Sequence, residues 1–122
     1  RDVVFAGHVE FHELLAYYRL ADVFLCMSEH EGFCIPLLEA MYFQVPIVAY
    51  RSTAVPETLG GASIVVNRKE PELIAELVRE VLARRAFREN IAQRQNRRLA
   101  DFNERAATQR LRVCLESWLT ED

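Results

Sequence analysis

Two hydrophobic patterns alternate along the chain. Four short runs are apolar almost without interruption, which is typical of buried strands: 3–7, 23–27, 46–50 and 63–66. Elsewhere apolar residues recur every three or four positions, and this period predicts helices over 13–21, 36–41 and 71–82. A helical turn is expected at 55–59, and the Arg- and Gln-rich segment 90–102 is predicted to be helical and mostly solvated. Asn103 can cap a last helix whose apolar residues share one face: Leu111, Leu115, Trp118 and Leu119.

The alternation of short strands with helices predicts the α/β class. Fully apolar strands indicate a parallel sheet that helices cover on both faces, so we expect a Rossmann-like architecture with right-handed crossovers. Only four strands are visible, whereas doubly wound nucleotide-binding sheets usually hold about five or six. We therefore expect residues 1–122 to be a partial domain that lacks its first strands and belongs to a larger protein.

Composition excludes several classes of function. Hydrophobic residues make up 51% and charged residues 27% of the 122 positions, so the chain is neither a disordered tail nor a coiled-coil rod. A net charge of -3 argues against a general nucleic-acid binder, because such a protein must replace phosphate counterions. No apolar run approaches the roughly 18 residues that a membrane span needs.

The cysteines predict neither a disulfide framework nor a metal site. Cys26, Cys34 and Cys114 are scattered, and their spacing fits no zinc pattern. Three isolated thiols suit a reducing compartment, so a cytoplasmic location is expected.

The most informative stretch is 28–41, a polar loop that leaves the second predicted strand and enters a helix. In open α/β sheets, ligands bind beyond the carboxyl ends of the strands. The first turn of the helix offers backbone N–H groups and the positive end of its dipole, which suit a phosphate. Gly32 allows the backbone to approach a ligand closely.

Two carboxylates flank this turn. Glu31 lies before the helix, and Glu39 lies about one turn inside it. A carboxylate accepts hydrogen bonds from two adjacent hydroxyls, so a sugar diol or a ribose is a natural partner. On spacing alone, two solvated glutamates at an acidic helix start remain the simpler interpretation.

The sequence EGFCIPLLEAM at 31–41 resembles the EGFG-x-x-x-x-EA-M motif of retaining glycosyltransferases of the GT-B fold, known as glycosyl transferases group 1. Four further segments resemble the same family in the same order. They are FAGHV at 5–9, ADVFLCMS at 21–28, PIVA at 46–49 and VPE at 55–57. The resemblance runs from about residue 3 to 66, and it identifies the chain as similar to the C-terminal, donor-binding half of the fold.

The resemblance implies roles for individual residues. Glu31 would be the catalytic residue beside the transferred sugar, and Glu39 would bind the ribose. Val9 would lie near the base, with core packing as the alternative. The backbone N–H groups of Gly32, Phe33 and Cys34 would contact the donor sugar. The helix start, formed by Ile35, Pro36 and Leu37, would hold the diphosphate.

The resemblance also implies an activity. A hexose would move from a nucleoside diphosphate sugar to a hydroxyl of a glycan, a lipid or another acceptor, with retention of anomeric configuration. No cofactor is implied, and no metal, since the chain has no Asp-x-Asp cluster. The acceptor-binding N-terminal domain is missing, as is an Arg/Lys pair that would neutralise the diphosphate. The isolated chain is therefore expected to be inactive, and any membrane contact would come from the missing domain. Alternatives are a non-catalytic nucleotide-sugar-binding module and a sugar-nucleotide epimerase of the same fold.

Two departures from the family pattern change the expectations locally. Cys34 replaces the usual second Gly of the motif, and Gln44 follows Phe43 where the family prefers a small residue and then Gly. The lone lysine, Lys69, precedes a helix and is expected on the surface. Glu57 is expected to be a helix-start or loop-fixing residue rather than a catalyst.

Overall fold

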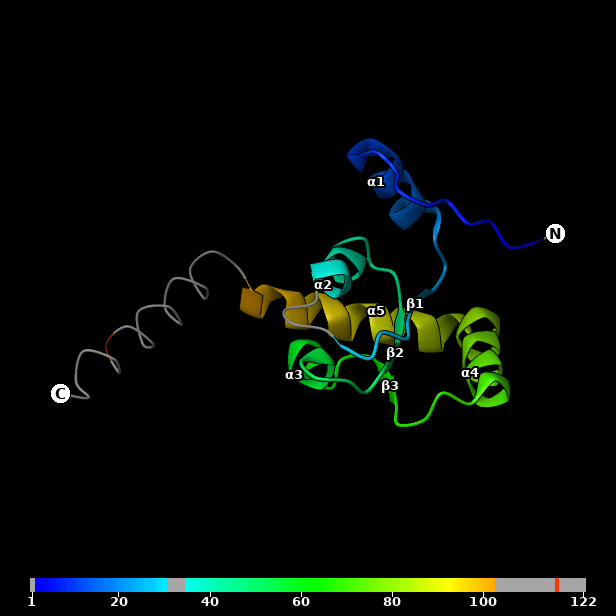
Figure 1. Cartoon of the computed structure of the whole chain (residues 1–122). Coiled ribbons are helices and arrows are strands. Elements are labelled where there is room, and N and C mark those ends of the chain that lie inside the picture. Colours follow the sequence, from blue (N-terminus) through cyan, green and yellow to red (C-terminus); the bar gives the residue numbers. More distant parts are fainter. Residues whose placement is uncertain (1, 31–34, 103–115, 117–122) are drawn as a thin grey trace.

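A small parallel sheet organises the protein. The computed structural model describes residues 2–30, 35–102 and 116. Its three strands lie in the order β1 (Phe24–Cys26), β2 (Ile47–Tyr50) and β3 (Ile64–Val66), as Figure 1 shows. β2 is buried on both faces along Ile47, Val48 and Ala49, which explains its uninterrupted apolar sequence. The parallel, Rossmann-like arrangement with flanking helices is confirmed.

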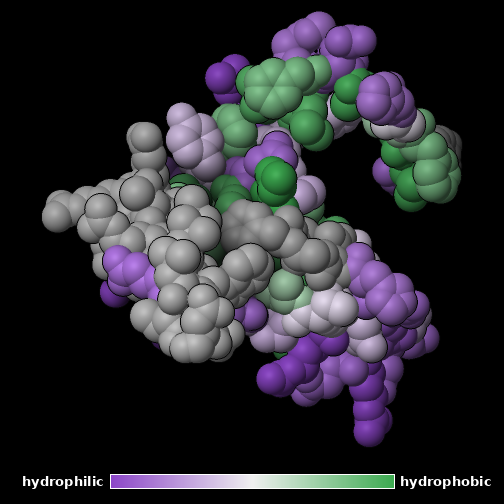
Figure 2. All heavy atoms as spheres, turned by 60° about the vertical axis from the view of Figure 1, so that its left-hand side comes forward, coloured by the Kyte–Doolittle hydropathy of each residue, from purple (hydrophilic) through white to green (hydrophobic). Residues whose placement is uncertain are grey.

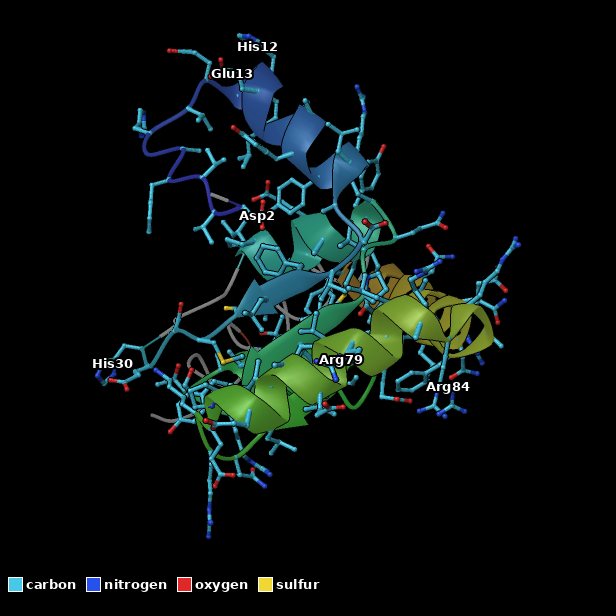
Figure 3. The ribbon with its side chains drawn as sticks, turned by 90° about the vertical axis from the view of Figure 1, so that its right-hand side faces the viewer. Asp2, His12, Glu13, His30, Arg79 and Arg84 are labelled. Carbon is cyan, nitrogen blue, oxygen red and sulfur yellow. The ribbon has the colours of Figure 1, made fainter. Side chains whose placement is uncertain are left out.

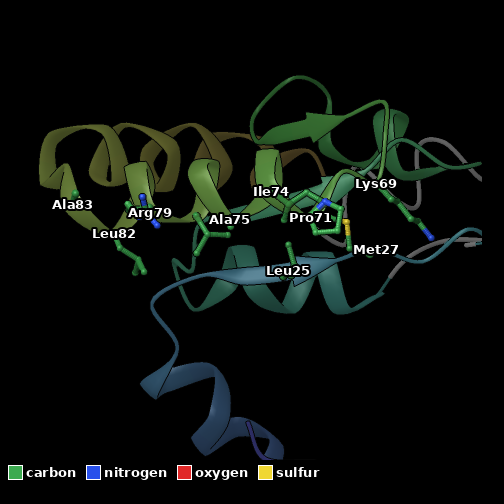
Figure 4. Close-up of a pocket in the computed structure, with 10 residues that line it drawn as sticks. Leu25, Met27, Lys69, Pro71, Ile74, Ala75, Arg79, Leu82 and Ala83 are labelled. Carbon is green, nitrogen blue, oxygen red and sulfur yellow. The ribbon is translucent and has the colours of Figure 1, made fainter. Parts of the chain in front are cut away.

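The predicted helices are present. They are α1 (Phe11–Leu20), α2 (Ile35–Tyr42), α3 (Val55–Leu59), α4 (Pro71–Ala83) and α5 (Arg85–Leu99), followed by the 3-10 turn η1 (Ala100–Phe102). The helix expected after Asn103 lies outside the described residues. α2 and α4 lie on opposite sides of β1 (Figure 4), so β1 has one face toward each helix. On the α2 side, the core is made of fully buried side chains from α2, β2 and α3: Leu37, Ala40, Met41, Ile47, Ala49, Val55 and Leu59.

The prediction of a strand at 3–7 is wrong for the described structure. The segment is not in a strand, and Val3, Val4 and Phe5 are 73%, 80% and 94% exposed. Figure 2 shows this N-terminal arm and α1 arching away from the rest of the molecule, with hydrophobic surface at the tip of the arm. An apolar run becomes a strand only when a neighbouring strand satisfies its backbone groups. In the described sheet, β1 pairs with β2 alone, and the arm forms no ladder with the free edge of β1.

An apolar hollow of about 830 Å³ separates β1 from α4. Figure 4 shows Leu25 of β1 pointing toward Ile74 and Ala75 of α4 across this space. Leu25 is 49% exposed, although it lies in an apolar run that predicted burial on both faces. The sheet is therefore closed on its α2 face and open beside β1 on its α4 face.

α5 joins the amino ends of two strands. Its Gln95 is fully buried, although the sequence predicted a mostly solvated segment here. The Gln95 side-chain oxygen accepts hydrogen bonds from the Ile47 backbone N–H at 2.9 Å and from the Ser63 hydroxyl at 2.8 Å. Its amide nitrogen donates to the Val45 carbonyl at 2.8 Å. One side chain therefore satisfies two buried backbone groups at the start of β2 and a part-buried hydroxyl at the start of β3.

The end of α2 explains one departure from the family pattern. Gln44 has φ 59°, which is the left-handed conformation, and its N–H donates to the Met41 carbonyl at 3.0 Å. The Val45 N–H donates to the Ala40 carbonyl at 2.9 Å. These two bonds form a Schellman motif, whose left-handed position is usually Gly because a Cβ is strained there.

We expect Gln44→Gly to raise the free energy of unfolding by about 0.5–1 kcal/mol, because relief of the left-handed strain exceeds the added entropy of the unfolded chain. The Gln44 side chain is exposed, so little contact is lost. Urea unfolding measures the change. Gln93→Gly, at an exposed position inside α5, is the control and should destabilise by about 1 kcal/mol. A loss of stability in Gln44→Gly would contradict the assignment.

Candidate functional site

The candidate site lies at the carboxyl ends of the three parallel strands. After β1, the segment from Met27 to His30 runs toward α2. His30 is exposed at this end of the sheet, while Arg84 lies at the other end of the molecule in Figure 3. Four predicted site residues, Glu31, Gly32, Phe33 and Cys34, lie outside the described residues. Their roles remain predictions, while the elements on both sides of them are described.

The start of α2 is exposed at the sheet edge. Ile35 is the first residue of the helix and is 58% exposed, whereas Leu37 is fully buried in the core. The helix is thus anchored by Leu37 while its first turn meets solvent at the sheet edge. Backbone N–H groups of a first helical turn have no partner within the helix, and the dipole adds positive potential there.

Glu39 lies four residues after Ile35 and therefore on the same face of α2. Both residues line a hollow of about 650 Å³ between α1 and α2. The rest of its lining is mostly apolar, with one cation: Phe11, Leu14, Leu15, Arg19, Leu38, Tyr42 and Phe43. Glu39 is half-buried, and its carboxylate has no hydrogen-bond or ion-pair partner within 2–30 and 35–102. The structure thus brings Ile35 and Glu39 to one concave surface.

Tyr18 fixes α1 beside α2 and so forms this hollow. Its ring stacks on Phe43 with centroids 5.5 Å apart, and Phe24 lies 5.9 Å from it on β1. The Tyr18 hydroxyl lies 3.4 Å from the Pro36 carbonyl, in the first turn of α2. Val9, predicted to lie near the base, is half-buried just ahead of α1 and does not line the hollow.

Residues after β2 and β3 reach the loop that follows β1, which the sequence did not predict. The buried Ser52 donates its hydroxyl hydrogen to the Ser28 carbonyl at 2.7 Å. The Lys69 ammonium forms a 3.0 Å ion pair with Glu29. The hydrogen bond that Lys69 donates to Glu29, and secondarily the positive charge of Lys69, hold the pKa of Glu29 below its ordinary value. In the sequence, the only indication of these contacts is that Ser52 and Lys69 each follow a predicted strand, and that parallel strands end at the same edge of a sheet.

Three further expectations concern Glu57, metal binding and membrane-spanning helices. Glu57 lies in the first turn of α3 and is exposed, as expected of a helix-start residue. Among the described residues, no group of three or more potential metal ligands is close enough to hold a metal ion. None of the described helices is long and apolar enough to cross a membrane.

Comparison with known proteins decides the family. The family model described as "Glycosyl transferases group 1" matches residues 1–98, which is most of the chain. The chain belongs to the glycosyl transferases group 1 family. The resemblance carried by the motif at 31–41 and its four companion segments is thereby confirmed.

Relatives in the glycosyl transferases group 1 family act on different substrates. The chain is 33% identical over 85 residues to the O-antigen chain mannosyltransferase B of Escherichia coli, covering 70% of this chain and 22% of that protein. It is 31% identical over 114 residues to the sulfoquinovosyl transferase SQD2 of Arabidopsis thaliana, covering 89% of this chain and 22% of SQD2. A Mycobacterium tuberculosis relative, named as a GDP-mannose-dependent alpha-(1-6)-phosphatidylinositol monomannoside mannosyltransferase, is 36% identical over 89 residues. Those residues are 66% of this chain and 23% of the relative. The chain thus spans about a fifth of the length of these relatives.

A solved structure places the fold within the same family. The C-terminal domain of the glycosyl transferase group 1 family protein LpcC from Francisella tularensis matches with a TM-score of 0.69 and 26% identity. The match covers 80% of this chain and 51% of that domain. The fold is therefore that of a GT-B C-terminal domain.

Proposed function

We propose that this chain binds the donor in a retaining glycosyltransferase, as the nucleotide-sugar-binding part of a longer protein. The donor would be a nucleoside diphosphate sugar, whose hexose passes to a hydroxyl of a glycan, a lipid or another acceptor. The observation that carries the proposal is the shared surface of Ile35 and Glu39, which both belong to the family motif at 31–41.

Each part of the donor has a proposed contact. The diphosphate would meet the first turn of α2, from Ile35 to Leu37, where the N–H groups of Ile35 and Leu37 and the helix dipole favour negative charge, while Pro36 has no N–H to donate. Glu39 would accept hydrogen bonds from the ribose diol, a chemistry that suits a half-buried carboxylate without a described partner. Val9 would lie by the base, and Gly32, Phe33 and Cys34 would donate to the sugar through their backbones.

The chemistry depends on stabilising the leaving diphosphate. As its bond to the sugar breaks, negative charge grows on the phosphate oxygens, and fixed dipoles that already point there lower the barrier. The proposal requires no metal for this step. Glu31 would support the developing positive charge on the sugar, while the leaving phosphate itself takes the proton from the acceptor. The acceptor would be held by a second domain across the cleft, so this chain alone should not transfer sugar.

Glu39→Ala in the full-length protein tests the donor site. We expect it to weaken binding of GDP or UDP about 10- to 100-fold, because a charge-assisted hydrogen bond is worth about 1.5–3 kcal/mol. Calorimetric titration with each nucleotide measures the loss. Glu57→Ala is the matched control, because Glu57 is also a glutamate in a helix at this edge but is exposed. Equal affinities for Glu39→Ala and the unmodified protein would refute the ribose contact.

A further inference from the structure

The ion pair between Lys69 and Glu29 differs in kind from the other ion pairs of the described residues. Those five pairs join residues two to four positions apart in the sequence and stabilise single helices or turns. Lys69 and Glu29 are 40 residues apart. Their pair is therefore a tertiary contact, and it crosses the whole edge of the sheet from the segment after β3 to the segment after β1.

A second contact holds the Lys69 ammonium over β2, between its origin after β3 and its partner Glu29 after β1. Its nitrogen lies 4.8 Å from the ring centroid of Tyr50, the last residue of β2, which is a cation–π distance. The side chain of Lys69 is only 35% exposed, whereas that of its neighbour Arg68 is 81% exposed. Figure 4 shows Lys69 at the end of the hollow beyond Pro71, with its ammonium directed away from the hollow. Lys69 thus contacts the carboxyl-end region of all three strands.

Ser52 reinforces the same loop from β2. Its 2.7 Å hydrogen bond to the Ser28 carbonyl fixes the backbone one residue before Glu29. The backbone ladder continues at this edge, since the Arg51 N–H donates to the Val66 carbonyl at 2.8 Å. The segment Ser28–Glu29 is therefore tied to β2 by a buried hydroxyl and to the end of β3 by a charge.

We propose that Lys69 is a positioning residue for the donor site, which holds Ser28 and Glu29, in the first part of the loop between β1 and α2, at the sheet edge through its contacts with Glu29 and Tyr50. The inference rests on the proposed function, because this held segment precedes Glu31 and the diphosphate-binding turn of α2. Lys69 does not touch the donor in this assignment. It limits the arrangements open to the loop, so that less ordering remains to be done when the donor binds.

The test uses four variants of the full-length protein. Lys69→Met removes the charge and keeps much of the aliphatic stem. Lys69→Glu combined with Glu29→Lys restores an ion pair with reversed charges. Lys69→Arg keeps the cation, and Arg68→Met removes one positive charge from the neighbouring residue, whose own ion pair reaches only Glu70. The first measurement is hydrogen exchange of a peptide spanning residues 24–42, which needs no ligand.

We expect Lys69→Met to speed exchange in this peptide about 5- to 10-fold, because the variant loses both the ion pair and the cation–π contact. The charge reversal and Lys69→Arg should recover at least part of this protection, and Arg68→Met should leave exchange unchanged. Unchanged exchange in Lys69→Met, or equal acceleration in Arg68→Met, would overturn the positioning role.

Donor kinetics provide the second measurement. Lys69→Met should raise KM for the nucleotide sugar, and the Kd of GDP or UDP, by at least about threefold with kcat within twofold, because the bound donor reorders the loop. A fall in kcat at unchanged KM would overturn the proposal, since it would indicate direct contact of Lys69 with the reacting phosphate. Faster exchange with unchanged KM and Kd would also overturn it. If the unmodified protein neither binds nor turns over any nucleotide sugar, the proposed function fails, and the exchange data still report whether Lys69 orders the loop.

Discussion

Gln95→Met is expected to destabilise the protein by about 3–5 kcal/mol, the largest effect on stability among the substitutions considered. The variant keeps the length of the side chain but leaves three polar groups without their partner: the Ile47 N–H, the Val45 carbonyl and the Ser63 hydroxyl. Each buried group that loses its hydrogen bond costs about 1–3 kcal/mol. Since Gln95 is fully buried, water cannot replace its bonds to Ile47 and Val45 without opening the core, whereas the Ser63 hydroxyl is only part-buried.

Hydrogen exchange of the segment 45–50 at increasing urea concentration measures this loss within the sheet. Gln93→Met is the matched control, because Gln93 is exposed on the same helix and should change stability by less than about 0.5 kcal/mol. A similar small change in both variants would mean that the amide of Gln95 is dispensable to the sheet.

Glu31→Gln is expected to lower kcat about 100-fold or more while leaving affinity for GDP or UDP within about threefold. Under the proposed function, Glu31 faces the transferred hexose, whose positive charge develops only in the transition state. Removing one preorganised electrostatic contact of that kind costs about 10²–10³ in rate. A nucleoside diphosphate carries no hexose, so its binding should not depend on this carboxylate.

Steady-state kinetics and calorimetry on the same preparation separate the two quantities. His30→Gln is the control, because His30 is exposed in the adjacent position and has no proposed contact with the donor. Parallel losses of kcat and of diphosphate affinity in Glu31→Gln would contradict the division of roles between Glu31 and Glu39.

Local patterns predicted most of the fold. The apolar runs at 23–27, 46–50 and 63–66 became β1, β2 and β3, and the 3.6-residue period at 71–82 became α4. These signals succeed because the period of the apolar residues is local to each strand or helix, although burial itself is incomplete at Leu25 of β1 and along α4. The run at 3–7 has the same composition but is not a strand in the described structure, because strand formation depends on a neighbour and not on the run alone.

The candidate site was predictable only where its residues are close in the sequence. Ile35 and Glu39 share a face of α2, and a four-residue spacing on a predicted helix reveals such a pair. Lys69 and Glu29 meet across 40 residues, and neither has a distinctive neighbourhood in the sequence. Gln95 was equally hidden, because a glutamine among arginines gives no sign that its partners lie some 50 residues earlier.

The long reach of Gln95 has a consequence for how the chain matures on the ribosome. Its partners Val45 and Ile47 are synthesised 50 and 48 residues earlier. At a synthesis rate of about 5–20 residues per second, roughly 3–10 s pass between the synthesis of β2 and that of Gln95, whose side chain binds the amino end of β2. During that interval the most buried strand of the sheet has unpaired backbone groups at its start. Nascent β2 therefore stays incompletely hydrogen-bonded at its amino end until α5 has been synthesised.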